Sequence, residues 1–453
     1  MNYQHILTQQ REFFSTQATK DISFRKRQLE KLKKAIQNNE KVLYEAIEKD
    51  FGKSAIETYL TEISFIYNEI NYFLKNLNRL SKPKSVRTNL VNLPGSSQII
   101  PDPLGCTLII GAWNYPYQLT ICPMIAAMAA GNCCIVKPSE IANHTMQAME
   151  TVINSNFEEK YVHVIPGGVP ETTEILKLRF DKIFFTGSTK VGQIVYEAAA
   201  KHLTPVTLEL GGKSPAIISD DSNFELAAKR IVWGKFLNAG QTCIAPDYIL
   251  VSKKSEQKFL EYLKQYIEKF NYSEGSENYT NIINTRNFER LQNFITPEKI
   301  YFGGKSNAET RFLEPTILKN VNWDDDVMQE EIFGPILPVL TYEFFHEAIN
   351  MILSKEKPLS AYLFSNSSSE QRLFMDKLSF GGGCINDVLM HISNENLPFG
   401  GVGNSGMGSY HGRFGFDTFS HQKAILHKAT WGEPDLKYPP YTEKKKNWLK
   451  KIM

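Results

Sequence analysis

The chain has few of the features that mark secreted, membrane or nucleic-acid-binding proteins. Six of its 453 residues are cysteine, and their spacing is irregular, which argues against a disulfide framework or a zinc site. The first twenty residues contain no apolar signal segment, and the longest apolar run, 119–130, is broken by Pro123 and too short to cross a bilayer. A net charge of +2 disfavours nucleic acid as a partner. We therefore expect a cytoplasmic protein with reduced thiols and no metal.

The basic C-terminus is the one strongly charged tract. Five of the last ten residues are lysine, with Trp448 and Leu449 between them. A single short basic stretch gives little affinity for a membrane surface. We expect this tail to stay solvated rather than to contact a membrane.

Composition and periodicity indicate an α/β protein of two or three domains. With 42% hydrophobic and 22% charged residues, the chain can bury a large core. Apolar spacings of three and four predict helices up to about residue 82, including one over 24–50. Short apolar strands alternate with helices over 104–210 and again over 216–384, which predicts two parallel sheets.

A cysteine and a glutamate stand out as candidate catalytic residues. Cys243 follows the polar segment 238–242, where a helical pattern over 224–237 stops, whereas Cys106, Cys122, Cys133 and Cys134 lie in apolar runs. Glu209, 34 positions upstream, interrupts an apolar stretch, where burial would raise its pKa. Nearby glycines would let the backbone approach a substrate. Packing alone is the competing interpretation for any one cysteine.

Two strand-to-helix junctions indicate a nucleotide site. A predicted buried strand over 182–186 runs into Gly187, Ser188 and Gly192 and then a helix over 193–202, a geometry that binds anions. The spacing G-x-x-x-x-G matches neither the dinucleotide fingerprint nor a P-loop, so a plain tight turn is the alternative. Lys137 and Glu140 follow another predicted strand, over 132–136, at the sheet edge where ligands bind.

Seven motifs in the same order resemble the NAD(P)-dependent aldehyde dehydrogenases over nearly the whole chain, and in particular the class 3 branch that oxidises fatty and aromatic aldehydes. They are Trp113-Asn114-Tyr115-Pro116, Lys137-Pro138-Ser139-Glu140, Phe185-Thr186-Gly187-Ser188, Glu209-Leu210-Gly211-Gly212-Lys213, Gly240-Gln241-Thr242-Cys243, Glu330-Glu331-Ile332-Phe333-Gly334-Pro335, and the segment 398–406. The class 3 assignment rests on the short N-terminus, the spacing and the closing segment 437–440.

The resemblance implies a fold of three parts. A Rossmann-like NAD(P)-binding domain would comprise 1–82 and 103–209, and an α/β catalytic thiol domain would comprise 210–405. A small β element for bridging and dimerisation, with the C-terminal tail, would comprise 83–102 and 406–453. A homodimer is the expected assembly.

The resemblance also implies a mechanism and a cofactor site. Cys243 would add to the aldehyde, Asn114 and the backbone N–H of Cys243 would stabilise the oxyanion, and Glu209 would activate the water that hydrolyses the thioester. The cofactor, NAD or NADP, would be held by a set of seven residues. They are Lys137, Glu140, Gly187, Ser188, Gly192, Glu331 and Phe333. Taken alone, Glu331 would be interpreted as part of a solvated acidic run.

The substrate is predicted to be a medium or long aliphatic, or an aromatic, aldehyde. The residues expected to line its tunnel are Tyr115, Gln118, Phe65, Trp233, Leu237 and His411, although aromatic residues serve as often in a core. His411 could equally occupy a surface turn. Three other functions compete: a CoA-acylating or phosphorylating dehydrogenase, against which Glu209 speaks, a thiol hydrolase, and a catalytically inactive structural protein.

Overall fold

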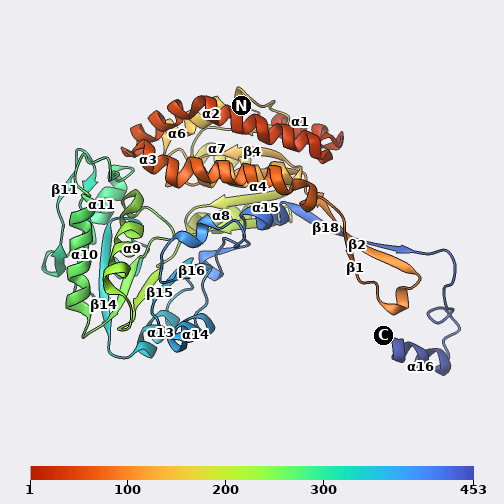
Figure 1. Cartoon of the computed structure of the whole chain (residues 1–453). Coiled ribbons are helices and arrows are strands. Elements are labelled where there is room, and N and C mark those ends of the chain that lie inside the picture. The colour runs from red at the N-terminus through yellow and green to blue at the C-terminus, as the bar shows by residue number, and fades with distance from the viewer. Residues whose placement is uncertain (1, 453) are drawn as a thin grey trace.

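The computed structural model describes residues 2–452, whose strands form two large sheets, a three-stranded sheet and a two-stranded ribbon. Figure 1 shows the N-terminal helices lying along one side of the body, the larger sheet region below and to the left, and a long arm that ends in the C-terminal helix. The predicted α/β fold class is confirmed.

The first large sheet has six strands in the order β17-β7-β6-β3-β4-β5, of which only β17 is antiparallel to its neighbour. Its strands are β3 (Cys106–Ile110), β4 (Cys133–Lys137), β5 (Val162–Val164), β6 (Lys182–Thr186), β7 (Val206–Glu209) and β17 (Gly406–Met407). The chain runs outward from β3 to β5 and then returns to β6 on the other side of β3. In open α/β sheets, ligands bind at such a reversal, at the carboxyl ends of the strands, which here are β3 and β6.

The helices of this sheet follow the expected alternation. They are α5 (Gln118–Ala130), α6 (Asn143–Asn154), α7 (Val169–Ile175) and α8 (Thr189–Ala200). Helix α8 begins four residues before the predicted start, because the Ser188 side chain accepts a hydrogen bond from the Val191 amide and caps the helix. The predicted strand over 182–186 is confirmed by β6.

Long N-terminal helices pack against this sheet region. They are α1 (Tyr3–Ser15), α2 (Ile22–Phe51) and α4 (Ser64–Leu80), with the short α3 (Ala55–Thr58) and the π-helical η2 (Tyr59–Ile63) between the last two. The predicted helix over 24–50 starts two residues earlier, because Asp21 caps the Ser23 and Phe24 amides. It ends at Phe51, and the residue that caps it, Gly52, has a φ of 68°, which suits glycine. The apolar face of α2 is buried against α6, α4 and α5.

The second large sheet has seven strands in the order β10-β13-β14-β9-β8-β15-β16. Its strands are β8 (Pro215–Ile218), β9 (Tyr248–Ser252), β10 (Ile300–Phe302), β13 (Thr316–Leu318), β14 (Ile336–Tyr342), β15 (Ser360–Phe364) and β16 (Gly382–Ile385). The ribbon is β11 (Ser306–Asn307) and β12 (Phe312–Leu313), and the helices are α9 (Phe224–Phe236), α10 (Glu256–Phe270), α11 (Thr285–Asn293), α12 (Asp326–Gln329), α13 (Phe345–Leu353) and α14 (Ser368–Lys377). The predicted second alternation of strands and helices is confirmed.

The third sheet forms the arm. Strands β1 (Lys84–Val86), β2 (Gly95–Pro103) and β18 (Ser420–Lys428) are antiparallel, and β2 pairs with β18 along its whole length. Helix α15 (Gly412–Thr418) precedes β18, and α16 (Glu443–Ile452) lies beyond it at the end of the arm (Figure 1). The small β element expected from the sequence is therefore present. The domain boundaries remain a prediction.

Replacing Leu32 with alanine tests the packing of α2. The Leu32 side chain is fully buried, and such truncations cost about 2–5 kcal/mol because a cavity remains. We expect the thermal unfolding midpoint to fall by several degrees. Val42→Ala on the same helix is the matched control, since Val42 is exposed. Equal midpoints for the two variants would contradict the assigned packing.

Candidate active site

Cys243 follows a backbone turn of unusual shape. Helix α9 ends at Phe236, and η4 (Leu237–Gly240) contains Asn238 and Ala239 with φ of 54° and 50°. The predicted end of the helical pattern before Cys243 is thus confirmed. The Cys243 side chain is partly exposed, whereas Cys106, Cys122, Cys133 and Cys134 are buried.

The glycines beside the candidate residues approach protein atoms rather than open space. A Cβ on Gly240, whose φ is 73°, would lie 2.3 Å from the Gly334 carbonyl oxygen. A Cβ on Gly211 would overlap the Glu331 carboxylate. These glycines let the Cys243 and Glu209 segments close on the 331–334 loop. Their part in admitting a substrate remains a prediction.

The surroundings of the Cys243 thiol disfavour its ionised form. Burial raises its pKa most, and the negative charges of Glu331 and Glu209 raise it further. The backbone amides of Cys243 and Ile244 act in the opposite direction. These effects place both carboxyls within electrostatic reach of the sulfur.

Glu209 lies at the carboxyl end of β7 and is almost completely buried. Neither side-chain oxygen has a hydrogen-bond partner among the described residues, and burial raises the pKa of this carboxyl well above its usual range. A buried carboxyl without a partner is costly to keep, and a raised pKa makes its ionised form a stronger base. The predicted burial of Glu209 is confirmed.

Asn114 lies just beyond β3 and joins the two sheet regions. Its side-chain nitrogen donates to the Gln241 carbonyl at 3.0 Å, two residues before Cys243. Asn238 donates from its own amide to the same carbonyl at 3.1 Å and to the Asn114 carbonyl at 2.9 Å. Because an amide group has two N–H donors, the Asn114 side chain keeps one for another acceptor.

The residues predicted to bind the ribose lie at the carboxyl end of β4. The Lys137 ammonium donates to the Pro138 carbonyl at 2.7 Å and the Gly167 carbonyl at 2.5 Å, and it lies 3.9 Å from the Glu140 carboxylate. Burial lowers the pKa of Lys137. An ammonium group has three donors, so one N–H of Lys137 is free of these two bonds. The Glu140 side chain is half exposed.

The glycines at α8 have structural roles that the sequence did not reveal. A Cβ on Gly187 would lie 2.6 Å from the Phe185 ring, and one on Gly192 would lie 2.7 Å from Leu210. Both therefore let α8 begin close to the end of β6 and pack tightly on the neighbouring strand.

Glu331 lies within electrostatic reach of the candidate thiol, and Phe333 follows it in the same loop. Burial, followed by the charge of Asp247, raises the pKa of Glu331 to about 8, so Glu331 is not part of a solvated acidic run. Its neighbour Glu330 is the exposed one and pairs with Arg290 at 3.1 Å. The Phe333 ring packs edge-on against Trp113 at 5.2 Å.

The predicted tunnel residues divide into two groups. The Tyr115 hydroxyl lies 2.6 Å from Thr242 Oγ1, beside Cys243, and Gln118 is buried with its side-chain nitrogen unpartnered among the described residues. Phe65 and Leu237 are partly buried, and Trp233 is exposed over about a third of its surface. No hydrogen bond or ring contact among the described residues joins these three to Tyr115.

His411 does not lie in a surface turn. It is buried, and its ring stacks on Phe399 with centroids 5.2 Å apart and contacts Tyr410 at 4.3 Å. Burial and the nearby His391 lower its pKa to about 3, which keeps it neutral. The alternative of a surface position was therefore wrong, because a neutral imidazole can be stacked in an aromatic core.

Several residues around the site carried no signal in the sequence. Asp247 accepts hydrogen bonds from Lys213 at 2.5 Å and from the Ile332 amide at 3.0 Å, which ties the loop after β7 to the 331–334 loop. Lys53, Glu57 and Glu62 are buried beneath the Asn114 and Asn238 turns. Charged residues on an amphipathic helix are usually expected on its solvated face.

Comparisons with known proteins identify the family. The model of the "Aldehyde dehydrogenase family" matches residues 1–425. The chain belongs to the aldehyde dehydrogenase family. It is 46% identical to mouse "Aldehyde dehydrogenase family 3 member A2", covering 97% of this chain and 92% of that protein. It is 47% identical to a Staphylococcus aureus "4,4'-diaponeurosporen-aldehyde dehydrogenase", covering 95% of each.

A solved structure of Staphylococcus aureus AldH in its substrate-bound state has the same fold. It superposes with a TM-score of 0.97 at 46% identity, covering 100% of this chain and 99% of that one. The predicted class 3 resemblance is confirmed by these relatives. The protein is therefore an enzyme that oxidises aldehydes with NAD or NADP.

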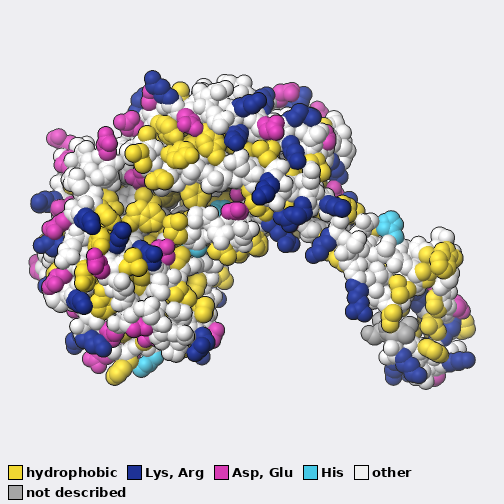
Figure 2. All heavy atoms as spheres, in the orientation of Figure 1, with side chains coloured by type: hydrophobic (Ala, Val, Ile, Leu, Met, Phe, Trp, Pro, Cys, Tyr) yellow, Lys and Arg dark blue, Asp and Glu magenta, His cyan; other side chains and the backbone are white. Residues whose placement is uncertain are grey.

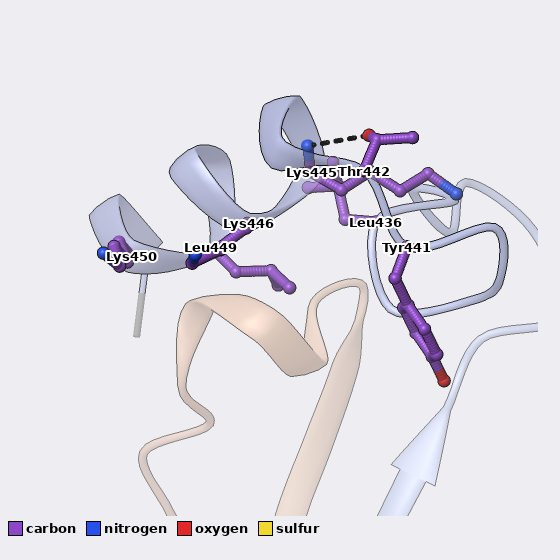
Figure 3. A pocket seen from close by; sticks show the side chains of 7 residues that line it. All are labelled: Leu436, Tyr441, Thr442, Lys445, Lys446, Leu449 and Lys450. Carbon is purple, nitrogen blue, oxygen red and sulfur yellow. Dashed lines mark hydrogen bonds between the residues drawn. The ribbon is translucent and has the colours of Figure 1, made fainter.

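The surface of this aldehyde dehydrogenase has a separate hollow on the arm. A pocket of about 280 Å³ lies between α16 and the segment before it, with Tyr441 pointing away from the helix (Figure 3). Its lining is Leu436, Tyr441, Thr442, Lys445, Lys446, Leu449 and Lys450. Figure 2 shows hydrophobic and basic side chains side by side on the arm.

The described residues contain neither a membrane-spanning helix nor a group of metal-binding side chains. Within 2–452, no helix is both long and apolar enough to traverse a bilayer. Over the same range, no three His, Cys, Asp or Glu side chains are grouped so that they could hold a metal ion.

The raised pKa of Cys243 predicts the pH dependence of its alkylation. A raised pKa means that little thiolate is present at pH 7 and that the fraction grows as pH rises. We expect the rate of Cys243 carbamidomethylation by iodoacetamide to be still climbing above pH 9, where an ordinary thiol with a pKa of about 8.5 levels off. Peptide mass spectrometry measures it, with a free-cysteine peptide as internal control. A plateau below pH 8 would contradict the assigned environment.

Proposed function

We propose that the protein oxidises medium- or long-chain aliphatic, or aromatic, aldehydes to carboxylic acids through a thioester on Cys243. The observation that carries the proposal is the shared Gln241 carbonyl, which binds the Asn114 amide two residues before Cys243. This bond holds a hydrogen-bond donor and a candidate nucleophile in one fixed unit. The buried, unpartnered Glu209 carboxyl supplies the third group.

In the first step, the Cys243 sulfur attacks the aldehyde carbon and the carbonyl oxygen becomes an oxyanion. The free N–H of Asn114 and the backbone N–H of Cys243 are the donors for that oxygen, and one such donor is typically worth about 3 kcal/mol. The thiol must lose its proton for this step, because its pKa is raised. That proton passes to solvent, and the backbone amides of Cys243 and Ile244 favour the resulting thiolate.

The residues present fit a dinucleotide cofactor. The strand order reverses between β3 and β6, α8 begins at that edge, and Lys137 has one donor to spare. Lys137 and Glu140 would hold the adenosine ribose, Gly187, Ser188 and Gly192 the pyrophosphate, and Glu331 and Phe333 the nicotinamide ribose and ring. When bound, NAD or NADP accepts the hydride that leaves the substrate carbon.

In the last step, water hydrolyses the Cys243 thioester. Glu209 accepts a proton from the water, the oxygen adds to the acyl carbon, and the C–S bond breaks to release the acid and free the sulfur. A CoA-acylating or phosphorylating enzyme would use another acceptor and would not need this base. The burial of Glu209 within electrostatic reach of the thiol therefore favours hydrolysis.

The preference for a large apolar aldehyde is supported by aromatic surroundings and by one relative. Trp113 packs on Phe333, and Tyr115 lies against Thr242. The Staphylococcus aureus relative is named for diaponeurosporen-aldehyde. We propose that Tyr115, Gln118, Trp233, Leu237 and His411 shape the substrate tunnel, with His411 acting through its stack on Phe399.

The arm supports a homodimer. Its three strands project away from the two large sheets (Figure 1). Exposed apolar side chains of the arm are Leu426 on β18, Leu90 between β1 and β2, and Trp431 after β18. We propose that this β element bridges two copies of the chain.

Three further expectations from the sequence stand as proposals. The domain divisions are those given above, the basic C-terminal tail stays solvated, and the enzyme is cytoplasmic.

A panel of aldehydes with NAD and NADP tests the proposed function. We expect absorbance at 340 nm to rise and one equivalent of acid to form without CoA or phosphate. Cys243→Ala should abolish both, and labelled aldehyde should be recovered on the Cys243 peptide of the wild-type protein. Cys384→Ala is the matched cysteine control. Ester cleavage without any change at 340 nm would favour a hydrolase instead.

Glu209→Gln tests the hydrolytic step. The amide cannot accept the proton from water, so the thioester should accumulate after one turnover. We expect an early burst of NAD(P)H close to one equivalent, followed by a steady-state rate lowered by about 100-fold or more. Rapid-mixing absorbance measures both phases. An unchanged steady-state rate would assign water activation to another group.

A further inference from the structure

Two buried carboxylates lie in an irregular helical segment before α4. Glu57 belongs to α3 and Glu62 to η2, and both are almost or fully buried. In a regular α-helix, residues five apart point about 140° away from each other. Here the segment widens into π-helical turns, with the Ser64 amide donating to the Tyr59 carbonyl five residues back. Both carboxylates nevertheless lie within electrostatic reach of the same ammonium, that of Lys53.

One lysine serves both carboxylates. The Lys53 ammonium lies 3.2 Å from Glu62 Oε1, and both side chains of this pair are fully buried. Burial raises the pKa of Glu57 and of Glu62, and the positive charge of Lys53 opposes that shift at each. The Lys53 ammonium also lies 4.6 Å from the centre of the Tyr115 ring. Removing these charged groups from water costs free energy. The hydrogen bonds that Glu57 and Glu62 accept therefore indicate what the cluster does.

Glu62 holds the turn that follows Asn114. Its Oε2 accepts hydrogen bonds from the Tyr117 amide at 2.7 Å and the Gln118 amide at 3.4 Å. These amides lie at the start of α5, where free N–H groups and the helix dipole favour a carboxylate. The segment that carries Asn114 is thereby fixed at its far end.

Glu57 holds the turn that precedes Cys243. Its Oε1 accepts a hydrogen bond from the Asn238 amide at 2.8 Å. Asn238 and Ala239 are both left-handed, a conformation that persists only when neighbouring groups stabilise it. The side chain of Asn238 then donates to the Asn114 and Gln241 carbonyls, and Gln241 accepts the Asn114 amide.

We propose that Glu57 and Glu62 are positioning residues that align the Asn114 oxyanion donor with Cys243. Glu62 fixes the Asn114 side of the site, and Glu57 fixes the Cys243 side through Asn238. Neither carboxylate touches the substrate. The inference rests on the proposed function, because the alignment matters only if Asn114 donates to the oxyanion and Cys243 is the nucleophile.

Three substitutions at Glu57 separate the hydrogen bond from the charge. Glu57→Gln keeps an acceptor oxygen at the same reach. Glu57→Asp keeps the charge near Lys53 but withdraws the oxygen by about 1.5 Å from the Asn238 amide. Glu57→Ala removes both. We expect kcat to fall about tenfold or more in the aspartate and alanine variants, and the glutamine variant to recover most of it, because small misplacements of reacting groups are costly.

A double-mutant cycle shows whether Glu57 acts through Asn114. Asn114→Ala alone should lower kcat by about 100-fold or more. If Glu57 only aligns Asn114 and Cys243, Glu57→Ala should lower kcat by less than about threefold in the Asn114→Ala background. The KM for NAD should stay within about twofold of wild type throughout. Glu45→Ala, at an exposed glutamate of α2, is the control.

The outcomes are distinct. Wild-type activity in both Glu57→Asp and Glu57→Ala would overturn the inference and leave the proposed function intact. So would an active aspartate variant beside an inactive glutamine variant, which would show that the charge matters and the bond to Asn238 does not. If Glu57→Ala does not fold, the aspartate and glutamine pair decides alone. A wild-type protein that forms no NAD(P)H from any aldehyde would overturn both proposals.

Discussion

The carbonyl of Gln241 is the point on which the candidate active site depends. It accepts hydrogen bonds from the side chains of Asn114 and Asn238, which belong to parts of the chain more than 120 residues apart. One segment follows a strand of the six-stranded sheet and the other follows a helix of the seven-stranded sheet. Because a single acceptor joins the two segments, the relative position of the Asn114 donor and the Cys243 thiol is fixed, although the two residues belong to different sheet regions.

Burial controls the chemistry of the ionisable groups around this carbonyl. It raises the pKa of Cys243, Glu209 and Glu331 together, and within the described residues no cation is hydrogen-bonded to the side chain of any of the three. The thiol and the carboxyls are therefore held in their neutral forms, and each becomes more basic once it ionises. Each of these groups becomes a strong base only after it has lost its own proton. The proposed reaction removes two protons, one from the Cys243 thiol and one from the water that hydrolyses the thioester.

The rigid frame around the site is built from polar groups that carry no reaction. Asp247 with Lys213 ties down the 331–334 loop, and Glu57 and Glu62 with Lys53 support the two turns on the other side. Buried charged clusters of this kind are poor sources of stability. Here Glu62 and Glu57 accept backbone hydrogen bonds from the two turns. The arm and its exposed apolar residues stand apart from this frame (Figure 1).

The sequence by itself determined the alternation of strands and helices, the buried position of Glu209 and the break before Cys243, because each of these is written in local periodicity or in a polar residue within an apolar run. It could not predict that Gly240 and Gly211 close on the 331–334 loop, that His411 is stacked in an aromatic core, or that Glu57 and Glu62 are buried. These depend on which distant segments fill the space beside each residue. A glutamate on an amphipathic helix has the same local pattern whether it faces water or a backbone amide 181 residues away, so only the tertiary structure decided its role.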